Sequence, residues 1–346
     1  MKYSIIVPVY NRPDEVDELL ESLTKQTLKD FEVVIVEDGS IKPCKDVCDK
    51  YANILDLHYY AKENSGPGQS RNYGVERAHG EYVIILDSDV VLPNSYLQAV
   101  DNGFSQSSSP NAQHPIIAFG GPDAAHPSFT PVQKAISYSM TSFFTTGGIR
   151  GGKAKLDKFY PRSFNMGIRR DVYLQLEGFT KMRFGEDIDF SYRIVEAGYM
   201  PRLFPDAWVW HKRRTDFRKF FRQVYNSGIA RINLEKRHPG TMKLVHLLPT
   251  VFTLGVIGLL LITLFFPLAC VPILLYSTII CIDSSIKNKS LWVGLLSIPA
   301  AFVQLMGYGF GFIESWWKRC ILKQDEFSLC ERPEVERTAF EKNFYK

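Results

Sequence analysis

The feature that most constrains the fold of this chain is an uncharged stretch, Leu244–Ile282, which contains no Asp, Glu, Lys or Arg. As a single helix it would be about 58 Å long, whereas the hydrocarbon core of a bilayer is about 30 Å thick. The stretch must therefore fold back on itself, and Phe266–Pro272 holds the prolines that predict the turn. We expect two transmembrane spans, at about 246–265 and 268–282; a buried hairpin in a soluble domain is the alternative.

A second uncharged run covers residues 291–313 and is also long enough to span a bilayer, but its flanks disfavour a third crossing. Two spans return Lys287 to the side of the N-terminal region, which suits the positive-inside rule if that region is cytoplasmic. A third span would then place Lys318 outside. Pro299 and the glycines after it can bend the run, so we predict a re-entrant or interfacial hairpin, with a third span as the alternative. Residues 314–346 are expected to form a polar cytoplasmic tail.

Basic residues gather beside the uncharged runs, at 212–243 and at Lys318–Lys323, and the net charge of the chain is +4. This placement is typical of a membrane surface, and no zinc-finger, homeodomain or RNA-binding motif favours a nucleic-acid partner. Within 212–243, Asp216–Arg237 carries apolar side chains on one helical face, with Arg and Lys around them. Such a basic amphipathic helix can lie at the membrane interface, although packing of the same stripe on protein fits the pattern equally well.

The N-terminal region is expected to stay in the cytoplasm. Its first apolar run, Tyr3–Val9, is too short for the core of a secretory signal peptide. The cysteines are scattered, which suits reduced cytoplasmic thiols better than a disulfide framework or a zinc site. Together with the uncharged runs, these features predict a multi-pass protein of the cytoplasmic (inner) membrane, in contact with its lipids.

Residues 1–211 alternate short apolar runs with amphipathic stretches, which predicts strands and helices in turn. Strands are expected at 3–9, 31–36, 55–60 and 81–86. One helix is expected to begin at Pro13, others to cover 46–51 and 184–198, and another to follow Gly66–Gly68 and end at about Ala78. Repeated β-α-β units imply an α/β domain with a mostly parallel sheet and flanking helices. In such sheets the ligand binds beyond the carboxyl ends of the strands.

Polar clusters follow three of these strands. Pro8–Asn11 ends the first strand, Glu37–Ser40 the second and Asp87–Asp89 the fourth. Because the carboxyl ends of parallel strands meet at one edge of a sheet, the clusters are expected to converge there. Their convergence is more informative than any single cluster.

Asp87-Ser88-Asp89 places two carboxylates in a turn where they can hold a hard divalent cation. Taken alone, an acid–x–acid turn is more often solvated, but its position at a strand end favours the metal. Glu186-Asp187 begins a predicted helix, where a carboxylate is first of all a cap and can also act as a general base. His211 follows a strand-like run from Arg202; it is either a packed histidine or a metal ligand.

Together these motifs resemble the family 2 glycosyltransferases, which have the GT-A fold, a Rossmann-like, mostly parallel sheet with flanking helices. The matching stretches occur in family order within residues 1–235 and are Ser4–Asn11, Val36–Ser40, Asn64–Gly74, His79–Asp89, Ser163–Arg170, Gly178–Phe179, Gly185–Asp189 and His211. The resemblance implies an enzyme that transfers a sugar from a nucleotide diphosphate sugar. It also implies a GT-A domain over 1–211, which precedes the interfacial helix region 212–243 and the membrane region 244–313 that the basic and uncharged stretches predict.

The resemblance also implies roles for individual residues. The residues expected to bind the nucleotide sugar are Pro8, Tyr10, Asn11, Asp38, Arg71, Asp87 and Ser88, with Asp38 accepting from the base and Arg71 beside the base or the diphosphate. The metal would be Mn²⁺ or Mg²⁺, held by Asp89 and Asp87 and completed by His211. Asp187 would be the general base, with Glu186 alongside, and the family inverts the anomeric centre by a single displacement.

The processive synthases of the family carry a Q-x-x-R-W motif after the base, whereas Gln223 is followed here by Val-Tyr-Asn-Ser. We therefore predict transfer of a single sugar. The resemblance implies a UDP-sugar as the donor, by frequency within the family. With the basic, membrane-facing helix, it predicts a membrane-associated acceptor such as a polyprenyl-linked glycan in cell-surface glycan synthesis. A short polysaccharide synthase is the alternative in the same class. A non-catalytic membrane glycan-binding protein is the alternative in another class.

Overall fold

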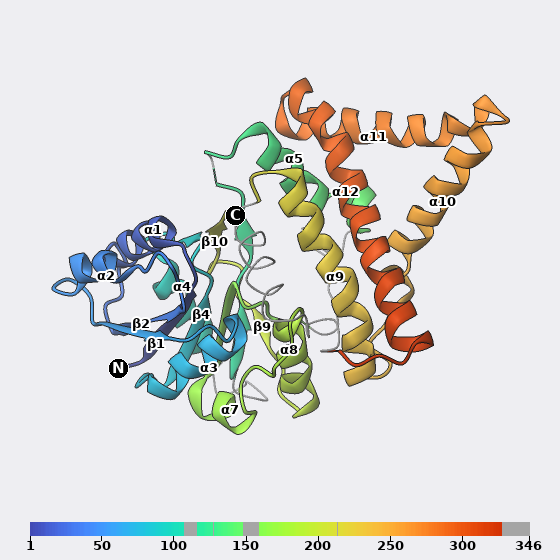
Figure 1. Ribbon diagram of the computed structural model, residues 1–346. Coiled ribbons are helices and arrows are strands. Elements are labelled where there is room, and N and C mark those ends of the chain that lie inside the picture. The colour runs from blue at the N-terminus through green and yellow to red at the C-terminus, as the bar shows by residue number, and fades with distance from the viewer. Residues whose placement is uncertain (107–115, 127, 148–158, 213, 327–346) are drawn as a thin grey trace. The chain divides into compact units, whose positions relative to one another are not determined.

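The computed structural model describes residues 1–106, 116–126, 128–147, 159–212 and 214–326. The chain forms two compact units, the first of Met1–His126 with Leu156–Lys212 and the second of Pro127–Lys155 with Arg213–Lys346. Figure 1 shows the elements of both. Of the predicted polar tail, residues 327–346 lie outside the described part of the chain.

The first unit is built on a seven-stranded sheet of order β3-β2-β1-β4-β8-β6-β9. Its strands are β1 Tyr3–Val9, β2 Phe31–Asp38, β3 Leu57–Lys62, β4 Tyr82–Leu86, β6 Ala118–Gly120, β8 Asn165–Arg169 and β9 Arg202–Leu203. The strands β1 to β4 pair in parallel, and only β8 runs antiparallel to its neighbours β4 and β6. The prediction of an α/β fold with a mostly parallel sheet is confirmed.

Both faces of this sheet are covered, because successive side chains of a strand point to opposite faces. Ile5 of β1 belongs to a core with Leu19 and Leu23, whereas Ile6 belongs to a second core with Val75. These partners come from helices on the two faces. The helices of the unit are α1 Pro13–Thr24, α2 Lys45–Tyr51, α3 Pro67–Arg77, α4 Tyr96–Gln106, α7 Arg170–Gln175 and α8 Glu186–Glu196.

A small three-stranded sheet completes the first unit. It pairs β10 (Val209–His211) antiparallel with β5 (Val90–Val91) and parallel with β7 (Asp123–Ala124). The strand-like run from Arg202 is therefore two short strands in different sheets, interrupted by a turn at Pro205. In the small sheet His211 pairs with Val90, the residue that follows Asp89.

The second unit is helical. Its helices are α5 Pro131–Thr141, α6 Phe143–Thr146, α9 Phe217–Arg237, α10 Leu248–Thr263, α11 Val271–Asn288 and α12 Leu291–Trp316, with short helical turns at Leu244–His246, Pro267–Cys270 and Trp317–Ile321. Among the described residues, three helical segments are long and apolar enough to cross a membrane: Leu244–Thr263, Pro267–Asn288 and Leu291–Ile321. The predicted break near Phe266 is present, because α10 ends at Thr263 and the next helical turn begins at Pro267.

The predicted hairpin within 291–313 is wrong, since α12 is one continuous helix that includes Pro299. Its glycines allow close packing and do not bend the chain. A Cβ at Gly309 would lie 2.2 Å from the Thr253 hydroxyl, and one at Gly311 would lie 2.0 Å from the Tyr225 carbonyl oxygen. Small residues at such positions let helix backbones approach, which is a common device in membrane helices.

The apolar stripe of α9 packs on protein. Phe220 and Val224 are buried and form one cluster with Ile136 and Met140 of α5, while α12 lies along the same helix (Figure 1). Of the two possibilities for this stripe, packing within the protein is therefore the one the structure shows. The burial of Phe220 and Val224 leaves these side chains unavailable to a membrane surface.

The contact between α9 and α12 gives a first prediction. Gly311→Ala is expected to lower the stability of the chain by about 1–3 kcal/mol, because the added methyl group overlaps the backbone of Tyr225. Thermal unfolding in a fixed detergent measures the change. Gly258→Ala in α10 is the matched control, since a Cβ there meets nothing within 4 Å; an equal loss in both variants would refute the close-packing explanation.

Candidate active site

The loops after β1 and β2 are tied together at the carboxyl edge of the sheet by Asn11. This residue adopts a left-handed backbone conformation, with φ of 56°. Its backbone N–H donates to Ser40 Oγ at 2.7 Å, and its Oδ1 accepts from the N–H groups of Ile41 and Lys42 at 2.8 and 2.9 Å. Asn11 therefore sets the shape of the edge where a ligand would bind.

Asp38, at the end of β2, organises the loop that leads into α3. Its Oδ1 accepts from the Ser65 N–H and its Oδ2 from the Gly66 N–H, both at 2.9 Å. Lys62 forms an ion pair with Oδ1 at 2.6 Å, and the carboxylate is almost fully buried. In this structure both oxygens serve the protein itself, so Asp38 shapes the loop at the predicted nucleoside site.

The other residues predicted to bind the nucleoside lie at the same strand ends. Pro8 in β1 pairs with Val36 of β2 and, like Tyr10 just after the strand, is partly exposed. Ser88 is buried between Asp87 and Asp89. The strand ends thus bring these positions to one edge of the sheet, as the sequence predicts.

Arg71 joins two motifs that are far apart in the sequence. Its Nη2 lies 2.8 Å from Asp87 Oδ1 and its Nη1 lies 2.9 Å from Glu186 Oε1. The guanidinium side chain is only 4% exposed. Burial would lower the pKa of Arg71, but Asp87 and Glu186 together raise it above its ordinary value. One permanent cation therefore holds the end of β4 against the N-terminus of α8.

Asp89 and His211 meet beside this ion pair. His211 Nε2 lies 3.2 Å from Asp89 Oδ1, and Arg12 Nη1 lies 3.1 Å from Asp89 Oδ2. The His211 ring stacks on Phe164, with ring centroids 5.0 Å apart. Pairing of β10 with β5 explains the geometry, because it places His211 opposite the residue next to Asp89.

The residues predicted to bind a metal are grouped in space. Asp87, Asp89 and His211 each offer one ligand atom, and these atoms all lie within 4.8 Å of one another. Carboxylate oxygens are the preferred ligands of Mg²⁺ and Mn²⁺, and a neutral imidazole is a common metal ligand. The donor set therefore fits a divalent cation.

Asp187 is the second residue of α8, next to Glu186, and is buried. Arg162 Nε lies 2.6 Å from its Oδ2, and the Ile188 N–H donates to its Oδ1 at 2.9 Å. Burial would raise the pKa of Asp187, but Arg162, assisted by Arg71, holds it below its ordinary value.

The pKa of Glu186 is raised, although that of the adjoining Asp187 is lowered. Burial raises the pKa of Glu186, Arg71 opposes this effect and the negative charge of Asp187 adds to it. Gly185, at φ of 88°, supplies the left-handed turn that starts α8 and presents both carboxylates. The two neighbours therefore differ in proton affinity: Arg162 keeps Asp187 ionised, whereas Glu186 holds a proton more readily.

The sequence did not identify the arginines that contact these carboxylates. Arg12 and Arg162 pair with Asp89 and Asp187, respectively, across 77 and 25 residues of chain. A signal was present, since Arg12 follows Asn11 at a strand end and Arg162 precedes the Ser163–Arg170 motif. An arginine beside a motif does not by itself indicate which carboxylate it meets.

Comparisons with known proteins agree with these motifs. The sequence model of Glycosyl transferase family 2 matches residues 4–172. Poly(ribitol-phosphate) beta-N-acetylglucosaminyltransferase TarS of Staphylococcus aureus is 43% identical over 93 residues, which cover 26% of this chain and 15% of that protein. Cholesterol galactosyltransferase of Borreliella burgdorferi is 32% identical over 102 residues, which cover 29% of this chain and 28% of that protein. The chain thus matches less than a third of the length of these curated relatives.

A solved structure shares the fold over most of the chain. The mannosyltransferase PcManGT of Pyrobaculum calidifontis, in complex with GDP-Man and Mn²⁺, superposes with a TM-score of 0.61 at 17% sequence identity. The match covers 92% of this chain and 88% of that one. The GT-A fold expected from the sequence is confirmed. Residues 4–172 therefore form a Glycosyl transferase family 2 domain.

Proposed function

We propose that this chain is a metal-dependent, inverting glycosyltransferase. It transfers one sugar from a nucleotide diphosphate sugar, a UDP-sugar in the first instance, to a membrane-associated, lipid-linked acceptor in cell-surface glycan synthesis. The observation that carries the proposal is the double ion pair of Arg71. Its guanidinium joins Asp87, one of the proposed metal ligands, to Glu186, which adjoins the proposed base Asp187. A donor cation and a general base can therefore act on the same sugar.

The donor side rests on the strand-end carboxylates. Asp87, Asp89 and His211 would hold a Mn²⁺ or Mg²⁺ ion, whose Lewis acidity offsets the charge that develops on a departing diphosphate. The relatives are named for the transfer of N-acetylglucosamine or galactose, and the mannosyltransferase of the same fold was solved with GDP-Man and Mn²⁺. These names support a nucleotide-sugar donor for this chain as well.

The acceptor side rests on Asp187. Its carboxylate receives the proton of the acceptor hydroxyl while the acceptor oxygen forms a bond to the anomeric carbon. In the same step the bond between that carbon and the diphosphate oxygen breaks, and the configuration inverts. Arg162 holds the carboxylate ionised and in a fixed orientation. A single base facing the donor is what one displacement requires.

The membrane supplies the proposed acceptor. Three helical segments in the described chain are apolar enough to cross a bilayer, which supports a lipid-linked acceptor such as a polyprenyl-linked glycan. We assign the protein to the cytoplasmic membrane, with the catalytic domain on the side that holds nucleotide sugars. The missing Q-x-x-R-W motif after Gln223 favours transfer of one sugar over polymer synthesis.

The donor site is tested by calorimetry with a panel of UDP, GDP and their sugars, with and without Mn²⁺. We expect binding that requires Mn²⁺, with UDP ahead of GDP. Asp89→Asn is expected to weaken the Mn²⁺-dependent binding by at least about tenfold, since it removes a metal ligand. Asp49→Asn in α2, a surface carboxylate paired with Lys45, is the matched control. Equal donor affinity in both variants, or binding that ignores Mn²⁺, would contradict the proposal.

A further inference from the structure

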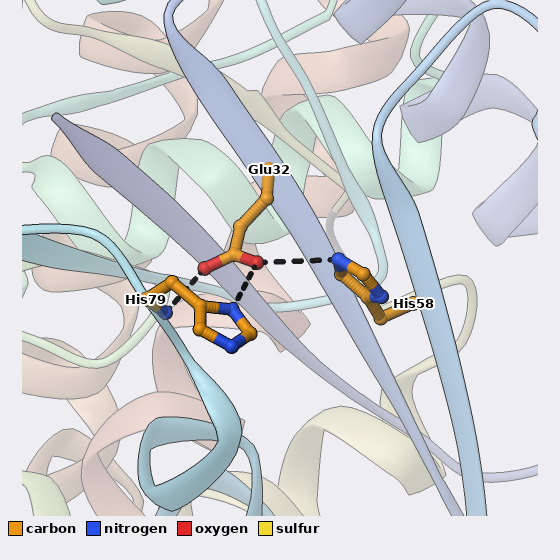
Figure 2. A group of neighbouring side chains, drawn as sticks. All are labelled: Glu32, His58 and His79. Carbon is orange, nitrogen blue, oxygen red and sulfur yellow. Dashed lines mark hydrogen bonds and ion pairs between the residues drawn. The ribbon is translucent and has the colours of Figure 1, made fainter. Parts of the chain in front are cut away.

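A second cluster of metal-ligating side chains lies at the amino ends of the parallel strands, whereas the candidate active site lies at their carboxyl ends. Glu32 is near the start of β2, His58 near the start of β3, and His79 lies between α3 and β4 (Figure 2). Glu32 and Asp38 are separated along β2 by about 20 Å, at roughly 3.3 Å per residue. The cluster therefore cannot belong to the donor site.

Both imidazoles converge on one carboxylate oxygen. His58 Nε2 lies 3.3 Å and His79 Nδ1 lies 3.1 Å from Glu32 Oε2, as the dashed lines in Figure 2 show. Asp56 is in reach as a further ligand, with its Oδ1 3.2 Å from His58 Nε2. Ligands that surround zinc tetrahedrally, at bonds of about 2.0–2.1 Å, lie roughly 3.3 Å from one another. The three separations agree with that spacing.

Hydrogen bonds from the protein also orient the Glu32 carboxylate. Ser4 Oγ donates to Glu32 Oε1 at 2.5 Å, and the backbone N–H of His79 donates to the same oxygen at 2.6 Å. The Gly80 N–H in turn donates to Ser4 Oγ at 2.8 Å. Metal-binding carboxylates are commonly oriented by such outer hydrogen bonds. They leave Oε2 directed at the two histidines.

Glu32 needs a positive partner. Its side chain is fully buried near the amino end of β2. Hydrogen bonds from Ser4 Oγ and from the His79 backbone N–H stabilise the ionised form of this carboxylate. Among the residues that the structure describes, its ion-pair partners are His58 and His79, and an imidazole is positive only when protonated. A buried anion of this kind is stabilised by a cation.

We propose that Glu32, His58 and His79 bind a divalent transition metal ion, Zn²⁺ in the first instance, with Asp56 or water as the remaining ligand. Two imidazoles and a carboxylate form a ligand set typical of zinc, whereas Mg²⁺ and Ca²⁺ prefer oxygen ligands alone. The partly exposed His58 and the largely exposed His79 give the ion a path from solvent.

The ion would act as a structural clamp. β3 is the outermost strand at its end of the sheet, and the metal would tie it to β2 and to the segment that enters β4. Because this edge is remote from Asp38 and Asp87, the ion is expected to raise stability without entering the sugar-transfer step. This inference does not depend on the proposed function.

The test measures zinc in the whole chain, purified in detergent and stripped with a chelator. His211→Ala is used as the background so that the other candidate cluster cannot retain zinc, and Mg²⁺ is kept in excess. After incubation with Zn²⁺ and gel filtration, elemental analysis is expected to find close to one zinc ion per chain and a raised Tm. Adding His79→Asn is expected to weaken zinc binding by more than about 100-fold, because loss of even an outer-shell partner costs about 10–100-fold.

Two further variants make the result decisive. His126→Asn, which changes a histidine outside the cluster, should retain the zinc. Glu32→Gln keeps the shape and the acceptor for Ser4 but removes the charge, and should lose the zinc. Because His79 is largely exposed, the metal-free Tm of its variant should match that of the background. Zinc retained after His79→Asn would show that the ion binds elsewhere and would overturn the proposal. Absence of zinc from the background would overturn it as well, and a Tm that responds only to pH would then indicate a protonated histidine pair.

Discussion

Asp187→Asn is expected to reduce the rate of sugar transfer by about 10²–10⁴-fold, the usual contribution of a positioned general base. The amide keeps the size of the side chain and can still accept from the Ile188 N–H, but it cannot take up the proton of the acceptor hydroxyl. Affinity for the nucleotide sugar should change little, because the proposed donor ligands are Asp87, Asp89 and His211. Single-turnover transfer and calorimetric donor binding measure the two effects separately.

Glu186→Gln separates the two neighbouring carboxylates. Glu186 is paired with Arg71, so its change should disturb donor binding together with the rate, whereas Asp187→Asn should act on the rate alone. Glu196→Gln, at the far end of the same helix, is the matched control and should transfer at the normal rate. Full activity of the Asp187→Asn variant would end the assignment of the base, while leaving the metal and donor proposal open to its own test.

Arg71→Met is expected to lower the free energy of unfolding by about 3–5 kcal/mol, because it leaves buried carboxylates without their shared cation. Glu186 is 13% exposed and Asp87 is 31% exposed, so most of the loss should come from Glu186. For a protein of this size the change corresponds to a Tm lowered by roughly 10 °C. Thermal unfolding in the same detergent as the parent chain measures it, and Mn²⁺-dependent donor binding should weaken in parallel.

The control for this variant lies on the same helix. Arg77→Met removes a partly exposed arginine that pairs with Glu76 and stacks on Tyr73, and an exposed pair of this kind contributes only about 0–1 kcal/mol. Arg71→Lys is expected to be intermediate, because an ammonium group cannot span two carboxylates as a guanidinium does. Similar stability of the Arg71→Met and Arg77→Met variants would show that the bridge contributes little.

Local pattern was enough to predict the frame of the site. Apolar runs such as Tyr3–Val9 and Tyr82–Leu86 are typical of strands buried on both faces, and their ends carry Asn11 and Asp87 to one edge. The start of α8 at Glu186 also followed from sequence, because acidic residues in the first turn mark a helix N-terminus. These features depend on neighbours in the chain, which periodicity can detect.

Long-range partners could not be predicted in the same way. The pairing of Arg162 with Asp187, and that of Arg12 with Asp89, arise only once the sheet is assembled. Glycines were ambiguous for a different reason: Gly309 and Gly311 were interpreted as points of bending, whereas a missing side chain equally permits a neighbouring backbone to approach. Spacing within one helix does not reveal which of these two uses applies.

The guanidinium shared by Asp87 and Glu186 has a consequence for the order of events. A cation bound at Asp87 would weaken the ion pair between Asp87 and Arg71. Arg71 would then interact more strongly with Glu186, which favours the ionised form of Glu186. By reciprocity, an ionised Glu186 makes capture of a cation at Asp87 easier. In the proposed reaction, Arg71 would thereby couple the two halves energetically, so that loading of the donor would prepare the protein for the acceptor before any bond is broken.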